Sequence, residues 1–173
     1  MSTDLRESVE GWLRALGCQY RPVPDPQMVW HLEVQYPPGR PDHFLHVAEL
    51  KGTVPSLVIA SLTRVSDQHV EVFNGLPVDE QRAFLFGLRH TLNSPEVDFE
   101  LQGMSSGPSC PRAFQVTARR FVDGLTLDAF ARSIGSVYKG ELSGIWFIQE
   151  NLEHDSFGPA VVFDFERSSM PQA

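Results

Sequence analysis

Residues 112–152 read "RAFQVTARRFVDGLTLDAFARSIGSVYKGELSGIWFIQENL" and carry two different hydrophobic periods in succession. Over residues 112–122 apolar and polar side chains alternate, which is typical of a half-buried strand. Over residues 127–152 apolar side chains recur three and four residues apart, which predicts a long amphipathic helix. Its core stripe is expected to contain Phe130, Ile134, Val137, Tyr138, Leu142, Ile145 and Ile148 or Gln149. A strand followed by such a helix favours an α+β fold.

The corner between this strand and this helix has a structural explanation at each residue. Asp123 and Gly124 form a strong turn pair, because glycine accepts positive φ. Thr126 is a suitable N-cap for the helix, and Asp128 stands near the positive end of the helix dipole. A catalytic carboxylate would need a partner base, and the sequence places none nearby. We therefore expect a turn and a cap here, and no catalytic residue.

The rest of the sequence supplies the other expected elements. Helical spacing predicts a helix over residues 3–16 and another within residues 66–93. Alternation and β-branched residues predict strands over residues 29–36, 43–50, 56–65 and 96–103. The expected order is α-β-β-β-α-β-β-α, an antiparallel sheet with helices packed on it, in a single domain over residues 1–153. The tail, residues 154–173, contains the alternating run "PAVVFDFER" and is expected to be either a docked strand or disordered.

Composition narrows the class of protein. The chain has 173 residues, is 42% hydrophobic and carries a formal net charge of -8, which disfavours nucleic-acid binding. No apolar run approaches the roughly 18 residues of a membrane helix, and the polar N-terminus does not resemble a signal peptide. Cys18 is expected to be packed and Cys110 to lie in an exposed loop. We therefore expect a cytoplasmic protein with two free thiols and no membrane contact.

Sequence motifs for chemistry are lacking. His43 and His46 are three residues apart, which on a strand directs them to opposite faces, and no zinc spacing, Walker loop, dinucleotide fingerprint or nucleophile elbow occurs. Strand alternation also places most acids and histidines outside. Glu141 interrupts the apolar stripe of the last helix, either as a buried carboxylate or at the rim beside Lys139. We expect no enzyme activity, no cofactor and no metal.

The last helix also carries a stripe of small residues, namely Ala129, Ser133, Ser136, Gly140, Ser143 and Gly144. Gly140 and Gly144 each cost about 1 kcal/mol of helix propensity relative to alanine, so a close approach of another backbone must compensate. That backbone belongs either to the chain's own fold or to a dimer seam or client groove. Tyr138, Trp146 and Phe147 complete the surface that we expect to contact another protein, since exposed aromatic residues are typical of interfaces.

The expected element order and the run over residues 114–152 resemble type III secretion chaperones, the related YbjN-like proteins and an uncharacterised prokaryotic family placed with them. The local match is the corner formed by Asp123, Gly124, Leu125 and Thr126, while the topological resemblance covers residues 3–152. This resemblance implies a non-catalytic protein that dimerises and binds a segment of another protein.

The sequence thus leads to two functional hypotheses. The first is a non-enzymatic, chaperone-like or adaptor module that binds a protein client of unknown identity and forms a homodimer. The alternative is a small-molecule binder or an unfamiliar enzyme with a pocket between the sheet and the helices. Convergent polar side chains in a concave site would favour the alternative.

Overall fold

The computed structural model describes residues 2–153, so the predicted tail strand lies outside the described residues. The described chain forms two compact units. The first unit holds residues 2–59 and 119–132, and the second holds residues 60–118 and 133–153. Each unit is considered by itself below.

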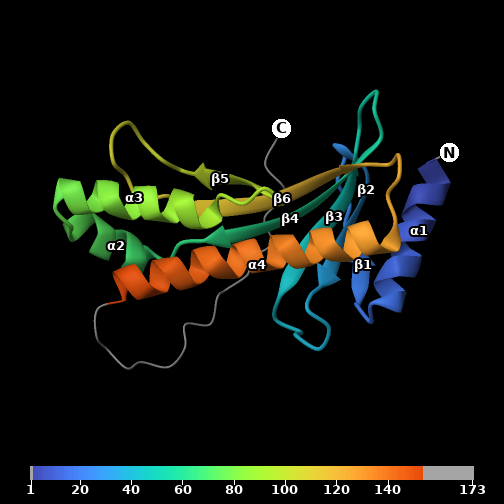
Figure 1. The fold of residues 1–173 in the computed structure, drawn as a ribbon, viewed down its shortest axis with the longest axis horizontal. Coiled ribbons are helices and arrows are strands. Elements are labelled where there is room, and N and C mark those ends of the chain that lie inside the picture. The colour runs from blue at the N-terminus through green and yellow to red at the C-terminus, as the bar shows by residue number, and fades with distance from the viewer. Residues whose placement is uncertain (1, 154–173) are drawn as a thin grey trace. The chain divides into compact units, whose positions relative to one another are not determined.

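The elements, in chain order, are α1 (Ser2–Ala15), β1 (Tyr20–Pro22), β2 (Met28–Gln35), β3 (Phe44–Leu50), β4 (Ser56–Arg64), α2 (Asp67–Gly75), α3 (Val78–Leu92), β5 (Asp98–Gln102), β6 (Ala113–Phe121) and α4 (Leu127–Leu152) (Figure 1). The six strands form one sheet in the order β1-β2-β3-β4-β6-β5. β1 with β2, β2 with β3 and β5 with β6 pair antiparallel. β4 and β6 are also antiparallel, because the amide of Val65 bonds to Arg112 O while that of Val122 bonds to Pro55 O. The expected α+β class with an antiparallel sheet is therefore confirmed.

The element order differs from the expected one in two places. The proline-rich stretch after α1 contains the short strand β1, because Val34 opposite Tyr20 and Leu32 opposite Pro22 extend the ladder of β2 to these residues. The expected single helix over residues 66–93 is two helices. Leu76 is extended, with φ -73° and ψ 148°, and ends α2, and Pro77 stands immediately before α3. A proline restricts the residue before it to extended backbone, so the helix cannot continue through Leu76.

The first unit is built on the β2–β3 ladder, whose register assigns side chains to two faces. Trp30, Leu32 and Val34 stand opposite Glu49, Val47 and Leu45 on one face. His31 and Glu33 stand opposite Ala48 and His46 on the other. In α1, the apolar positions Leu5, Val9 and Leu13 are buried, and the ring of Trp12 lies 5.5 Å from that of Phe130. The apolar face of β2 and β3 thus belongs to the core of this unit.

In the second unit, helix α3 packs against α4. Phe84, Leu85, Leu88 and Leu92 form the buried face of α3. The ring of Phe84 meets that of Phe73 of α2 edge to face, with 5.4 Å between the ring centroids. Figure 1 shows α3 and α4 running side by side in opposite directions along the strands. These two helices position the surface considered below.

Candidate functional site

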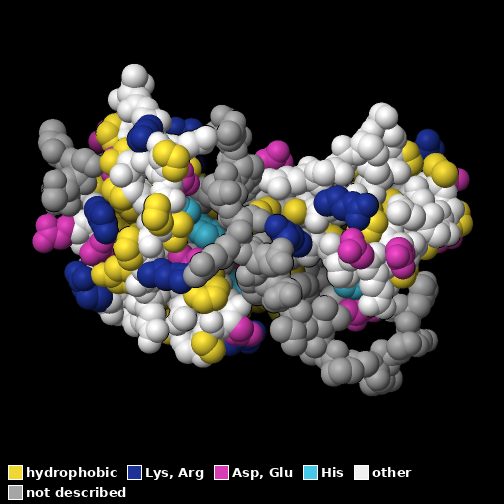
Figure 2. All heavy atoms as spheres, turned by 180° about the vertical axis from the view of Figure 1, so that it is seen from behind, with side chains coloured by type: hydrophobic (Ala, Val, Ile, Leu, Met, Phe, Trp, Pro, Cys, Tyr) yellow, Lys and Arg dark blue, Asp and Glu magenta, His cyan; other side chains and the backbone are white. Residues whose placement is uncertain are grey.

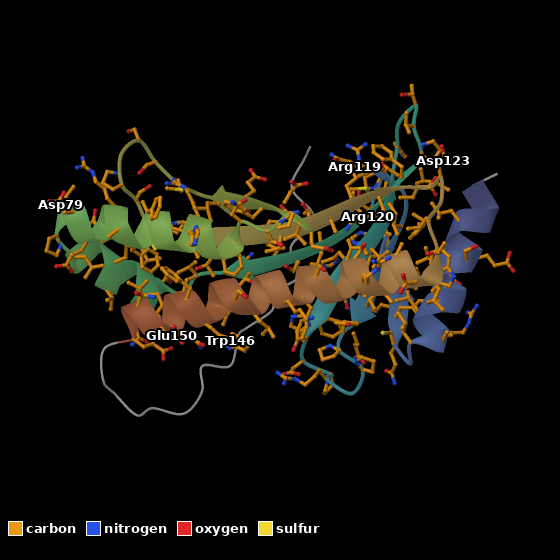
Figure 3. The ribbon with its side chains drawn as sticks, viewed as in Figure 1. Asp79, Arg119, Arg120, Asp123, Trp146 and Glu150 are labelled. Atoms are coloured by element: carbon orange, nitrogen blue, oxygen red, sulfur yellow. The ribbon has the colours of Figure 1, made fainter. Side chains whose placement is uncertain are left out.

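The corner that precedes α4 forms a turn and a helix cap. Gly124 has a φ of 78°, a conformation that favours glycine because it lacks a Cβ. Thr126 Oγ1 accepts a hydrogen bond of 3.2 Å from the amide of Ala129, which is an N-cap contact. Asp123 is exposed at the end of β6, and Figure 3 shows it at the tip of this corner, pointing away from α4. The geometry thus gives Gly124 and Thr126 the structural roles that the sequence predicts.

Gly140 and Gly144, the two glycines among the small residues of α4, face side chains of the chain's own second unit. A Cβ added at Gly144 would lie 2.8 Å from the ring of Phe114 and 2.9 Å from Leu92 Cδ2, and one at Gly140 would lie 3.0 Å from Val116 Cγ1. The close approach that compensates for these two glycines is therefore made within the second unit, to β6 and α3. Contact of Gly140 and Gly144 with another protein has no support in this geometry.

The three aromatic residues predicted for contact lie on different sides of α4. Phe147 is half-buried, lies 5.2 Å from the Phe84 ring, and would meet any side chain placed at Gly87. Tyr138 is half-buried. Trp146 is 57% exposed. Of the five residues that the sequence assigned to protein interaction, Trp146 is therefore the one that remains a large surface side chain.

Trp146 belongs to a row of four residues that we call the outward face of α4, namely Lys139, Ser143, Trp146 and Glu150. These positions lie on the side of the helix opposite its buried residues, such as Glu141, Ile145 and Ile148. Figure 3 shows Trp146 and Glu150 together on the outer edge of α4. Lys139, Trp146 and Glu150 are exposed and Ser143 is half-buried. More than half of the surface of Trp146 therefore stays outside the packing of the second unit.

Glu141 is a buried carboxylate of α4, which resolves the two alternatives left by the sequence. Its Oε1 accepts a hydrogen bond of 2.8 Å from Thr63 Oγ1 of β4, and its side chain is fully buried. Ser61 precedes Thr63 by two residues on the same face of β4, and its buried Oγ has no hydrogen-bond partner among the described residues. The two strand hydroxyls and Glu141 place polar atoms inside the second unit, and Thr63 gives the carboxylate one of the bonds that burial requires.

A second polar cluster occupies one face of the first unit. His31 Nε2 lies 2.9 Å from His46 Nδ1, and His31 Nδ1 lies 3.5 Å from Asp25 Oδ2. Glu33, opposite His46 in the ladder, accepts a bond of 2.7 Å from Arg21 Nε. Figure 2 shows histidine side chains among hydrophobic and charged ones on this side of the molecule. The arrangement is a chain of a carboxylate and two imidazoles, in which a proton can be shared but two positive charges repel.

The environment keeps both histidines of this cluster neutral. Burial lowers the pKa of His31, although Asp25 and Glu33 raise it in part. Burial, together with His31, lowers the pKa of His46 to about 4, and Glu33 opposes this. Desolvation disfavours the charged imidazole, and a neighbouring imidazolium would repel a second one. The pair is therefore uncharged near neutral pH.

Strand alternation places most acids and histidines outside, and most of those that the structure describes are not buried. The exceptions are six buried side chains, namely His31, His43, His69, Glu33, Glu49 and Glu141. They are accommodated because each has a polar neighbour, as when Glu49 accepts a bond of 2.6 Å from Trp30 Nε1. Cys110 is buried as well, not exposed, because the end of its loop packs beside β6. Burial raises the pKa of the Cys110 thiol to about 11, so it is a poor nucleophile.

The histidine cluster was not predicted from the sequence, although the sequence contains one signal for it. His31 and Glu33 lie two residues apart on β2, and His46 lies on the next strand, so a predicted β2–β3 hairpin already places them on one face in some registers.

No group of three or more His, Cys, Asp or Glu side chains within residues 2–153 is arranged to hold a metal ion. Within the same residues, no helix combines the length and hydropathy of a membrane span.

Comparison with known proteins places this fold among relatives. A protein family described as "Uncharacterized conserved protein (DUF2299)" matches residues 5–148. The solved structure of an uncharacterized protein from Methanothermobacter thermautotrophicus is similar, with 30% sequence identity and a TM-score of 0.76. That similarity covers 86% of this chain and 99% of the other. No curated protein matches the chain.

Proposed function

The chain belongs to the DUF2299 family, and from that premise we propose that it is a non-enzymatic protein-binding module whose contact surface is the outward face of α4. The observation that carries this proposal is the exposure of Trp146, at 57%, on a helix whose opposite face is already packed. Tryptophan is enriched at the energetic centres of interfaces because one side chain supplies a large contact area.

The surroundings of Trp146 fit an interface as well. Leu142 and Phe147 flank it and are half-buried. Lys139 lies about two turns before it and Glu150 about one turn after it, and both are exposed. An apolar centre with charged residues at its rim is the usual arrangement of a binding surface. The partner is either a second copy of the chain or a client protein.

The resemblance to type III secretion chaperones and YbjN-like proteins agrees with this role, and we retain it as part of the proposal. Under it the module is cytoplasmic, acts without a cofactor and holds a segment of its partner. Cys18 and Cys110 are both buried, and no group of three or more His, Cys, Asp or Glu side chains among residues 2–153 is arranged to hold a metal ion.

The proposal is tested by replacing Trp146 with alanine in the full chain. We expect the free energy of unfolding to change by less than about 0.5 kcal/mol, as for a surface substitution, while protein association is lost. Phe86→Ala is the matched control, because Phe86 is 74% exposed on α3 and stacks on His90 of its own helix. A Trp146→Ala chain that unfolds, or one that binds its partner as the parent does, contradicts the proposal.

A second candidate function is proton transfer or small-molecule binding at the cluster of His31, His46 and Asp25. The observation that favours it is the buried His31 Nδ1, whose neighbour Asp25 Oδ2 lies 3.5 Å away without the geometry of a direct hydrogen bond. A small-molecule screen monitored through the imidazole resonances of His31 and His46 tests this candidate. A ligand that shifts both resonances, and fails to bind a His31→Gln chain, supports it, and the absence of any such ligand removes it.

A further inference from the structure

The outward face of α4 repeats with the spacing of a coiled-coil seam. Lys139, Ser143, Trp146 and Glu150 follow one another at intervals of four, three and four residues, which is the spacing of the a and d positions of a heptad, with Trp146 as the one large apolar side chain among them. The position farthest from this seam is Glu141, which is fully buried. The seam therefore points away from the packed side of the second unit.

The two charges on this seam have opposite signs and lie at its opposite ends. The basic residue, Lys139, stands toward the N-terminal end, and the acidic residue, Glu150, stands toward the C-terminal end. Neither makes an ion pair with any side chain in the described part of the chain. Nearby charged residues of the same helix and its end do have partners, since Arg132 pairs with Asp128 and Glu153 lies 3.6 Å from His69. The two seam charges are thus available to another molecule.

We propose that the partner of this surface is a second copy of the chain, with the two α4 helices packed antiparallel about a twofold axis between residues 144 and 145. This inference rests on the proposed function and specifies its partner. In an antiparallel pair, residue positions that add up to 289 face each other, so Lys139 faces Glu150 of the second copy, and Ser143 faces Trp146. An a position meets a d position in each case, as antiparallel helix packing requires.

The antiparallel arrangement is selected by charge and by size. A parallel pair in the same register would set Lys139 against Lys139 and Glu150 against Glu150, and facing like charges are unfavourable. It would also set two tryptophans against each other, whereas the antiparallel pair sets each tryptophan against the small Ser143. The antiparallel arrangement thus provides both the space for the indole, opposite Ser143, and the two ion pairs between Lys139 and Glu150.

The expected association is weak. One pair of helices buries less than the roughly 1,200–2,000 Å² of a stable interface, and the seam has one large apolar residue per copy. We therefore expect a reversible dimer that forms in the range of about 10 µM to 1 mM. Its ion pairs are exposed at the rim, so the association is expected to weaken as salt is raised.

Sedimentation equilibrium of the purified full chain over that concentration range tests the inference. Lys139→Glu and Glu150→Lys should each weaken dimerisation about tenfold, and the double variant should restore it to within about threefold, because the two sites interact across the dimer. Trp146→Ala should abolish it, and Phe86→Ala should leave it unchanged. Urea unfolding of each variant verifies that the fold is kept.

A parent chain that stays monomeric throughout, or a dimer that is insensitive to both charge reversals, overturns the inference. Neither result removes the proposed function, since a client protein that loses its affinity for the Trp146→Ala chain would still support binding at this surface. Loss of dimerisation in both single variants without recovery in the double variant also overturns the antiparallel register.

Discussion

Thr63 Oγ1 of β4 donates a hydrogen bond of 2.8 Å to Glu141 Oε1 of α4, and both side chains are buried in the second unit. Seventy-eight residues separate the two in the sequence. A bond from a hydroxyl to a buried carboxylate is stronger than one between neutral groups, and losing it leaves a costly polar group inside the protein. The pair therefore fixes how α4 lies on β4 beneath the outward face that carries Trp146.

Removing this hydroxyl should destabilise the protein. Thr63→Val keeps the size of the side chain but removes the donor to Glu141, which should lower the free energy of unfolding by about 1–3 kcal/mol. Urea denaturation monitored by circular dichroism measures the change. Thr117→Val on β6 is the control, because this half-buried strand threonine makes no hydrogen bond through its side chain among the described residues. Equal effects of the two substitutions would show that the Thr63–Glu141 bond contributes nothing.

Two helical glycines should respond to alanine in opposite directions. Gly144→Ala gains about 1 kcal/mol of helix propensity but presses a methyl group against the buried Phe114 and Leu92, so a net loss of about 1–2 kcal/mol is expected. Gly11→Ala in α1 meets nothing within 4 Å and should stabilise the chain by about 0.5–1 kcal/mol. Thermal or urea unfolding of the two variants measures both changes in the free energy of unfolding. Stabilisation by Gly144→Ala would mean that α4 does not approach β6 closely.

The cap of α4 should contribute a measurable share of stability. Thr126→Ala removes the oxygen that accepts from the Ala129 amide and should cost about 1 kcal/mol. Thr126→Ser keeps the oxygen and should restore most of that loss. If the alanine and serine variants unfold at the same urea concentration, Thr126 does not act as a cap.

Stability should fall on mild acidification because of the histidine cluster. The pKa of His46 is lowered to about 4 and that of His31 is also lowered, while an unfolded histidine titrates near 6.5. Below pH ~6.5 the unfolded chain therefore binds protons that the folded chain refuses. The stabilisation is complete above that pH and is lost as the pH falls toward 4.

The loss at His46 should amount to about 1–2 kcal/mol, less than the full pKa difference implies, because the side chain is only half-buried and partly screened by water. The groups that face it are His31 and Glu33 on β2, with Asp25 and Arg21 beyond them. Unfolding free energies between pH 7.5 and 4.5 should fall more steeply for the parent than for His46→Gln. The exposed His90→Gln is the control, and equal slopes for His46→Gln and the parent would refute the assignment.

The helix with the clearest hydrophobic periodicity could be predicted from the sequence. The elements that exist only through contact with a neighbouring strand could not. The bounds of α4 agree with its hydrophobic period, since that signal is carried by 26 residues. The strand β1 has three residues and one proline, so it exists only because β2 offers it a ladder. The break between α2 and α3 has a signal in Pro77, because a proline restricts the residue before it to extended backbone.

Part of the candidate site could be predicted from the sequence, and part could not. The exposure of Trp146 follows from its position off the apolar stripe of α4, and the heptad spacing can be counted in the sequence. The burial of His31 and Glu33 could not be predicted from alternation, because both faces of β2 are buried from Trp30 to Val34. Which strands pair, and in which register, decides such contacts, and neither is specified by a single strand.

The central claim, that the outward face of α4 binds protein, is tested most directly by photo-crosslinking. A photoreactive phenylalanine analogue is placed at position 146 in the full chain, and a matched chain carries it at position 86, an exposed aromatic site on α3. The account predicts a discrete protein adduct from position 146, either a covalent dimer or one recurrent partner, and none from position 86. The absence of an adduct at 146, or the same adducts from both positions, would contradict it.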